Sequence, residues 1–197
     1  MKIDTLVLGP VQTNCYIVYN EGAKEAVIID PAAEPEKIQE ALDGKRAAAI
    51  LLTHGHFDHT GALEAFKGTP IYIHPSDDVM LSDPVWSAGA MFRDKAPRPA
   101  ATDYVREGMK LHLAELDITV MHTPGHTLGS VVYAIGDTLF TGDTLFCGGY
   151  GRTDLMGGDV DEIARSIMRL LREEKDWIIC PGHGSLSTLN EEKARYI

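Results

Sequence analysis

The stretch of this chain that most constrains its fold and chemistry runs from Thr53 to Gly61 and reads Thr-His-Gly-His-Phe-Asp-His-Thr-Gly. Within six consecutive residues it holds four side chains that can bind a metal ion: His54, His56, Asp58 and His59. The apolar run at 47–52, directly before them, has the length of a buried strand. Because residues two apart in an extended chain point the same way, His54 and His56 can reach one ion together.

Asp58 and His59 are adjacent and would diverge unless the chain turns there. We expect a turn, because Gly55 loosens the backbone and residues 60–66 read as the start of a helix. Two imidazoles then aim one way, while a carboxylate and an imidazole aim another. This suits a pair of neighbouring metal ions better than a single ion. The alternative is a hydrated loop whose histidines share no role, and this spacing directly after a buried strand argues against it.

Length, charge and cysteine usage limit the possible classes of protein. The chain has 197 residues, which predicts one domain spanning 1–197. A net charge of -11 argues against a nucleic-acid partner or an anionic membrane surface. The sequence has three cysteines, Cys15, Cys147 and Cys180, which form no CxxC pair. It shows neither a signal peptide nor an apolar run of transmembrane length. A cytoplasmic location is therefore expected. The oligomeric state is left open.

The chain alternates strands and helices before it becomes rich in strands. Strands are predicted at 3–8, 15–19, 26–29 (closed by Asp30), 47–52, 71–73, 111–113, 117–122, 131–135, 138–140 and 177–180. Helices are predicted from Pro35 to Leu42, after a cap at Asp159–Glu162, and after a cap formed by Thr188 and Glu191. The segment 83–107 shows no regular hydrophobic periodicity, and it is either a lid over the substrate or an ordinary surface loop.

Three further candidate ligands each follow a predicted strand: His126, Asp143 and His183. Glycines flank each of them and allow the close backbone approach that a crowded site requires. Because sheets commonly gather their chemistry at the edge where strands end, we expect all the candidate ligands to converge on one site. Of the other histidines, His74 is expected to cap a turn. His112 and His122 are expected to be structural, although His122 could support His126.

The four motifs Thr-His-Gly-His-Phe-Asp-His, Thr-Pro-Gly-His-Thr, Thr-Gly-Asp-Thr and Pro-Gly-His-Gly resemble, in this order, those of the metallo-β-lactamase superfamily, and most closely its glyoxalase II-like branch. The resemblance implies an α/β fold: a four-layer αβ/βα sandwich of two mixed β-sheets flanked by helices, with a binuclear metal site along one edge. It also implies the ligand sets: His54, His56 and His126 for the first metal, Asp58, His59 and His183 for the second, with Asp143 bridging both.

The candidate ligands are N and O donors without a thiolate, which suits zinc and also admits iron or manganese. Two divalent ions sharing Asp143 would hold a hydroxide between them with a pKa near neutral, and Asp58 would orient it. A thiolate leaving group needs no strong general acid, and the sequence offers no obvious one. The leading hypothesis is therefore a metal-dependent thioesterase acting on S-acyl-glutathione or a similar small thioester.

Arg152 stands about where glyoxalase II enzymes carry a basic residue that contacts glutathione; a salt bridge to Asp154 is the alternative. Full-length glyoxalase II enzymes add a C-terminal helical segment that binds glutathione, and this chain, ending soon after His183, is expected to lack it. The Gly-Arg-Thr-Asp stretch also resembles the persulfide dioxygenase branch, which uses one iron, and this is the alternative enzyme. A redox module like that of the flavodiiron branch, β-lactam hydrolysis and RNA processing are less favoured.

Overall fold

The apolar runs of the sequence form two mixed β-sheets that pack face to face. The computed structural model describes residues 1–196. The first sheet has the order β1-β2-β3-β4-β5-β6, with β1 at Lys2–Leu8, β2 at Thr13–Tyr19, β3 at Glu25–Ile29, β4 at Arg46–Leu51, β5 at Ile71–Ile73 and β6 at Asp103–Tyr104. The second has the order β12-β11-β10-β9-β8-β7, with β7 at Lys110–Leu113, β8 at Leu116–His122, β9 at Val131–Ile135, β10 at Thr138–Gly142, β11 at Ile178–Pro181 and β12 at Ser187–Thr188.

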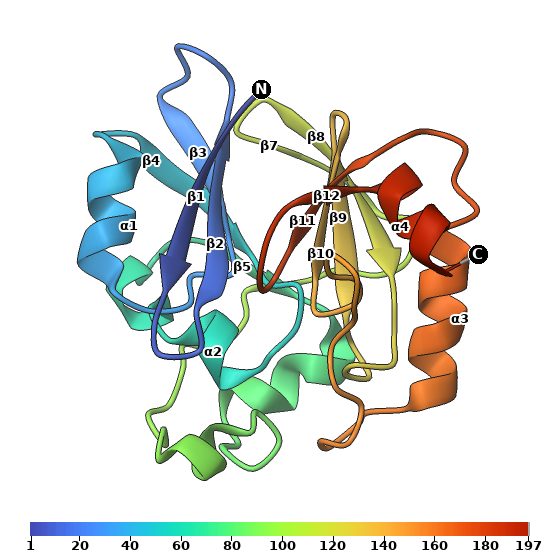
Figure 1. Cartoon of the computed structure of the whole chain (residues 1–197). Coiled ribbons are helices and arrows are strands. Elements are labelled where there is room, and N and C mark those ends of the chain that lie inside the picture. Colours follow the sequence, from blue (N-terminus) through green and yellow to red (C-terminus); the bar gives the residue numbers. More distant parts are fainter. Residues whose placement is uncertain (197) are drawn as a thin grey trace.

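Three helices cover the outer faces of the sheets: α1 at Pro35–Leu42, α3 at Val160–Leu170 and α4 at Leu189–Tyr196. The shorter helices are α2 at Phe57–Thr60 and the 3-10 helices η1 at Leu63–Phe66, η2 at Pro75–Leu81 and η3 at Gly89–Phe92. Figure 1 shows α1 outside the first sheet, and α3 and α4 outside the second. The predicted four-layer sandwich of two mixed sheets flanked by helices is confirmed. Over residues 1–196, no helix has the length and apolar character needed to cross a membrane.

The core is divided into three apolar layers by the alternation of side chains along the strands. In β2, Cys15 and Ile17 face the layer beneath α1, whereas Tyr16 and Val18 face the layer between the sheets. In β9, Val132 faces the layer that Ile163 and Ile167 of α3 fill, while its neighbours on both sides face the other sheet. Strands buried on both faces explain why the sequence shows continuous apolar runs.

The helix after β4, the segment 83–107 and the short strand β12 differ from the sequence-based prediction. A short helix, α2, spans Phe57–Thr60, so that Asp58 and His59 lie on α2 itself, and the predicted range 60–66 holds the separate 3-10 helix η1 at Leu63–Phe66. α2 ends at Thr60, and Gly61 follows it with a helical backbone at φ -63°. A side chain at Gly61 would collide with the backbone of Ala32, since its Cβ would come 2.2 Å from the carbonyl oxygen. Within 83–107, η3 forms and β6 pairs with β5, so part of this segment extends the first sheet.

Asp159 caps the start of α3, as predicted, but the capping box is incomplete, because the Asp159 N–H donates to the Gly125 carbonyl oxygen at 2.8 Å and not to the Glu162 carboxylate. The Asp159 carboxylate accepts hydrogen bonds from the backbone N–H groups of Asp161 and Glu162, both at 2.9 Å. Replacing Asp159 with alanine leaves these groups without that acceptor, and we expect the free energy of unfolding to fall by about 1 kcal/mol in a urea titration. Asp161→Ala is the matched control, because it removes the same charge from the first turn but keeps the cap. Equal decreases in the free energy of unfolding of the two variants would show that the effect comes from the lost charge and not from the cap.

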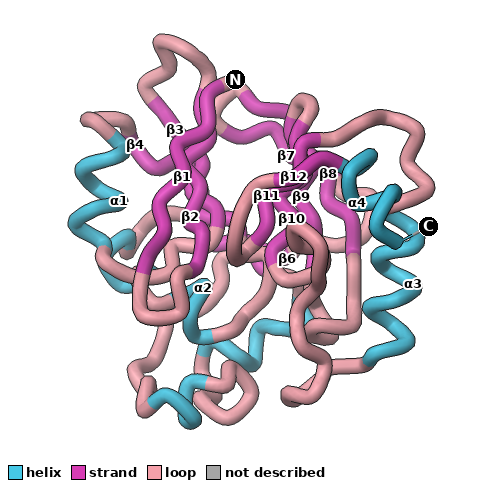
Figure 2. The backbone as a smooth tube through the Cα atoms, viewed as in Figure 1, coloured by secondary structure: helices cyan, strands magenta, loops and turns pink. Residues whose placement is uncertain are grey.

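The edge of the sandwich around α2 holds the loops that follow several strands. Figure 2 shows loops and short helices gathered below the two sheets, around α2. Hydrogen bonds join the two sheets near this edge: Val131 N–H donates to the Thr53 carbonyl oxygen at 2.8 Å, and the Tyr133 hydroxyl donates to the Leu52 carbonyl oxygen at 2.9 Å. These bonds fix the loop after β4 against the second sheet.

Candidate metal centre

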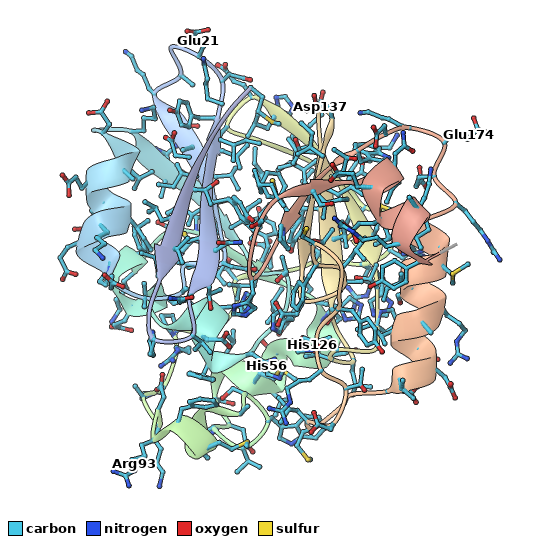
Figure 3. All side chains as sticks on the ribbon, in the orientation of Figure 1. Glu21, His56, Arg93, His126, Asp137 and Glu174 are labelled. Atoms are coloured by element: carbon cyan, nitrogen blue, oxygen red, sulfur yellow. The ribbon has the colours of Figure 1, made fainter. Side chains whose placement is uncertain are left out.

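All the ligand candidates predicted from the sequence lie at this edge of the two sheets. His54 and His56 are in the loop after β4, while Asp58 and His59 are on α2. His126, Asp143 and His183 follow β8, β10 and β11. His56 and His126, 70 residues apart in the chain, lie close together below the sheets in Figure 3. The structure thus brings together side chains from both halves of the sequence.

The first group of donors contains His54, His56 and His126. One ring nitrogen of each lies within 4.8 Å of one ring nitrogen of the others. His56 Nδ1 and His126 Nε2 are 2.9 Å apart. All three side chains are buried. Three imidazoles therefore aim at a common point, as the same-side argument for His54 and His56 predicts.

The second group contains Asp58, His59 and His183, again with donor atoms within 4.8 Å of one another. Asp58 Oδ2 lies 3.3 Å from His183 Nε2 and 3.6 Å from His59 Nε2. Asp143 stands between the two groups. Its Oδ2 is 3.4 Å from His126 Nε2 and its Oδ1 is 3.4 Å from His59 Nε2. Asp143 Oδ2 also lies 3.6 Å from His183 Nε2, so the carboxylate faces donors of both groups.

These residues fit a pair of divalent metal ions. Two ligands at about 2.0–2.1 Å from a tetrahedral ion lie roughly 3.3 Å apart, and the closest donor pairs here are separated by 2.9–3.6 Å. His54 Nε2, His59 Nε2 and Asp143 Oδ1 are buried without a hydrogen-bond partner among residues 1–196. Because buried polar atoms are nearly always paired, a cluster of such atoms facing one another is what a metal site requires.

The electrostatics of the site favour the protonation states that bind metal. Burial lowers the pKa of His54 well below its ordinary value, and the neighbouring His59 and His126 lower it further. Burial alone would raise the pKa of Asp58, yet the imidazoles of His59 and His183 lower it to about 2. The same balance lowers the pKa of Asp143. Neutral imidazoles and ionised carboxylates are the forms that coordinate metal ions.

His59 and His183 differ, because the pKa of each is raised; at His183, burial would lower the pKa, but the Asp58 and Asp143 carboxylates outweigh it. At His59 the effect is larger. Burial by itself would lower its pKa, but the carboxylates of Asp58, Asp30 and Asp143 outweigh burial and raise it well above the ordinary value. Three carboxylates around one imidazole favour positive charge at this place. A divalent ion would supply that charge.

Asp30 orients His59 and was not identified from the sequence, which indicates it only as the end of a strand. Its Oδ2 lies 2.9 Å from His59 Nδ1 and accepts the Thr53 hydroxyl at 2.6 Å. Its Oδ1 accepts the Thr53 N–H at 2.8 Å. With Nδ1 held in this way, His59 Nε2 faces the second donor group. The position of Asp30 in the sequence could have identified it, since Asp30 directly follows β3, just as Asp143 directly follows β10.

Asp77 joins the two loops that carry the first donor group, and sequence reasoning also missed it. Its Oδ2 accepts the Gly55 N–H at 3.2 Å and the Thr127 hydroxyl at 2.7 Å, while Oδ1 accepts the Gly129 N–H at 2.7 Å. Gly55 separates His54 from His56, and Thr127 follows His126. One buried carboxylate therefore holds both loops together.

The start of β2 supports the second donor group. Asn14 donates from its side chain to the carbonyl oxygens of Pro181 and Gly184, at 2.9 and 3.0 Å, on either side of His183. Thr13 donates its hydroxyl to Asp58 Oδ2 at 3.1 Å. Gly182, next to His183, leaves room for the Asp143 carboxylate, because a Cβ at position 182 would come 2.2 Å from Asp143 Oδ1.

Arg152 lies at the edge of the site, and its predicted ion pair with Asp154 forms. Its side chain forms a two-pronged ion pair with Asp154, at 2.6 and 2.7 Å, and also lines the cleft above the donors. Its carbonyl oxygen accepts from His126 Nδ1 at 2.7 Å, which orients that ring. The ion pair to Asp154 leaves the Arg152 side chain exposed.

The remaining histidines are structural, as expected. His74 caps η2 by accepting the Ser76 N–H at 3.2 Å. His122 donates to the Leu128 carbonyl oxygen at 3.0 Å and stacks on His74 with ring centroids 4.2 Å apart. His112 pairs with Asp117 on the surface.

The cleft over the donors has a volume of about 240 Å³. Its walls include Val11, Phe57, Phe92, Phe146 and Leu155. Phe92 stacks on Phe57 with ring centroids 4.7 Å apart, so the irregular segment 83–107 contributes a wall of the site. An apolar cleft with a few convergent polar groups is typical of a small-molecule site.

Comparisons with known proteins agree with this architecture. A family model described as the metallo-beta-lactamase superfamily matches residues 8–183. The hydroxyacylglutathione hydrolase GloC of Haemophilus influenzae is 34% identical over 203 residues, covering 98% of this chain and 95% of that protein. The crystal structure of the BLEG-1 B3 metallo-beta-lactamase aligns with a TM-score of 0.91 at 36% identity, covering 98% of this chain and 97% of that one. The crystal structure of TTHA1623 in a di-iron-bound form aligns with a TM-score of 0.85 at 37% identity, covering 96% of both.

Proposed function

The chain belongs to the metallo-beta-lactamase superfamily, and from that premise we propose that it is a binuclear-metal-dependent thioesterase acting on S-acyl-glutathione or a similar small thioester. The observation that carries the proposal is the position of Asp143, whose carboxylate faces donors of both groups. His54, His56 and His126 would hold one ion, Asp58, His59 and His183 the other, and Asp143 both. Zinc suits these donors, and iron is a second candidate because a 37% identical structure is described as di-iron-bound.

When bound, the two ions would supply a Lewis acid for the thioester carbonyl and a water of lowered pKa as the nucleophile. Asp58 is the residue we assign to orient that nucleophile. Its Oδ2 is fixed by the Thr13 hydroxyl at 3.1 Å, and the side chain lines the cleft. The ionised state of Asp58 follows from its pKa of about 2, so the carboxylate would accept a hydrogen bond from the nucleophile.

The cleft favours a thioester over an amide. Apart from the proposed ligands, Arg152 is the one titratable side chain among the described residues that line it. An arginine is a poor general acid because its pKa lies above about 12. A departing amine needs a proton, whereas a thiolate leaves without one. The hydroxyacylglutathione hydrolase GloC is matched over 95% of its length, so that relative has about the size of this chain.

Arg152 is proposed to bind a carboxylate of the thiol carrier. The Arg152→Gln variant is expected to raise KM for S-lactoylglutathione about five- to tenfold, because it loses one charge-assisted contact, with kcat changing little. Steady-state kinetics measure both constants. Arg165→Gln is the matched control, since Arg165 is also an exposed arginine with one acidic partner, Glu162, and does not line the cleft. An unchanged KM would show that Arg152 does not bind the substrate and that its role is the ion pair with Asp154.

Metal analysis followed by an assay with S-lactoylglutathione tests the proposed function. About two metal equivalents per chain, with hydrolysis lost in the His54→Ala variant, is the expected result. One iron per chain, with oxygen uptake on glutathione persulfide and no thioester hydrolysis, would replace the proposal by persulfide dioxygenase activity. Turnover of a chromogenic β-lactam in the absence of thioesterase activity would replace it by the reaction that the description of BLEG-1 names.

A further inference from the structure

A second hollow, which we call the side groove, opens beside the metal-centre cleft. Its volume is about 520 Å³, within the range of small-molecule sites. Its walls are largely apolar and include Leu8, Pro10, Val11, Ala32, Ala33 and Phe92. The side groove and the cleft share Val11, Phe57, Asp58 and Phe92, so the two hollows adjoin at the Asp58 carboxylate.

The wall that the two hollows share is held in place by the chain behind it. Phe57 donates its N–H to the Ser87 carbonyl oxygen at 3.0 Å and stacks on Phe92. Phe92 is 54% exposed and Val11 is 37% exposed, which is high for large apolar side chains beside a polar centre. Apolar surface that borders a binding cleft is the kind of surface a ligand covers.

The charges around the side groove argue against an anionic ligand. Its charged lining residues are Glu34, Asp58 and Asp94, and it has no lysine or arginine among them. Glu34 is already paired with Lys37, and Asp94 with Arg98. Arg152, in contrast, lines the cleft but not the side groove. A substrate with a charged thiol carrier would therefore direct the carrier towards Arg152 and its uncharged part into the side groove.

We propose that the side groove binds the acyl chain of the substrate, and that the preferred thioesters carry an apolar acyl chain longer than a lactoyl group. This inference rests on the proposed thioesterase function. The reacting carbonyl lies over the donor groups beside Asp58, and the acyl chain extends from there between Val11 and Phe92 towards Leu8 and Ala33. Burial of each additional methylene in the groove strengthens binding in the transition state as well as in the ground state.

The test is a series of thioesters of N-acetylcysteamine, an uncharged carrier that makes no demand on Arg152, from acetyl through butanoyl and hexanoyl to octanoyl. We expect kcat/KM to rise about two- to fourfold per added methylene. Ala33→Phe fills the side groove and is expected to lower the ratio of octanoyl to acetyl kcat/KM at least tenfold. Ala23→Phe is the matched control: Ala23 is also a half-buried alanine in a loop but lines neither hollow, and the ratio should stay unchanged. Phe92→Ser, at an exposed position, gives a second variant that should flatten the series.

A flat wild-type series, or equal losses on acetyl and octanoyl substrates in Ala33→Phe, would overturn the proposal. If neither S-lactoylglutathione nor any member of the series is hydrolysed, the proposed function fails, and the groove is then tested by binding alone. For this, the non-hydrolysable octyl thioether of N-acetylcysteamine is titrated into wild-type and Ala33→Phe protein by calorimetry. Binding that Ala33→Phe weakens at least tenfold supports the groove, and the absence of saturable binding to wild type rejects it.

Discussion

Replacing Asp143 with alanine is expected to reduce the metal content below one equivalent per chain and to lower thioesterase kcat/KM by at least about 10³-fold. The reason is its position between the donor groups, with Oδ1 3.4 Å from His59 Nε2 and Oδ2 3.4 Å from His126 Nε2. The variant removes a donor from both groups at once. It also removes one of the three carboxylates that favour positive charge around His59. Metal analysis after dialysis and steady-state kinetics measure the two effects.

Asp137→Ala is the control for this variant. Asp137 is an exposed residue in the turn between β9 and β10, at the end of the second sheet away from the centre (Figure 3). It makes the same chemical change and should leave metal content and kinetics unaltered. Two retained metals with full activity in Asp143→Ala would show that Asp143 does not bridge. One retained metal with full activity would show that a single ion suffices, as in the persulfide dioxygenase alternative.

The donor residues could be predicted from the sequence because each of them lies close to the end of an apolar run. The run 47–52 became β4, the run 138–140 became part of β10, and the ligand candidates follow in the loops and in α2. The cap residues Thr188 and Glu191 were also readable, because both partners lie within one turn: Thr188 Oγ1 accepts the Glu191 N–H at 3.3 Å, and the Glu191 carboxylate accepts the Thr188 N–H at 3.2 Å.

The residues that support the donors could not be predicted, because their partners come from distant parts of the chain. Asn14 donates to the carbonyl oxygen of Pro181, 167 residues away, and Asp77 accepts from Gly129, 52 residues away. The early start of α2 has a similar cause. His56 provides no side-chain cap, and the turn is instead fixed by tertiary contacts such as that between His59 and Asp30. β6 was missed because its two residues, Asp103 and Tyr104, are exposed and carry no apolar pattern.

Replacing Asp77 with alanine is expected to lower the free energy of unfolding by about 2–4 kcal/mol. The variant leaves the N–H groups of Gly55 and Gly129 and the Thr127 hydroxyl without their acceptor in a buried place. It also frees the loop of His54 and His56 from the loop of His126, so metal affinity should fall about 10- to 100-fold. Urea titration of the metal-free protein measures the first effect, and competition with a chromophoric chelator measures the second.

Two further variants separate the roles of Asp77. Asp78→Ala changes the adjacent carboxylate, which accepts from the Tyr104 hydroxyl at 3.0 Å, and should alter neither metal affinity nor stability by more than about 1 kcal/mol. Asp77→Asn keeps one acceptor oxygen but presents an amide N–H to a donor, so both losses should be intermediate. If Asp77→Ala lowers stability while metal affinity stays at the wild-type value, Asp77 supports the fold alone. If metal affinity falls in proportion to the number of acceptor oxygens lost, the Asp77 carboxylate holds the first donor group in position.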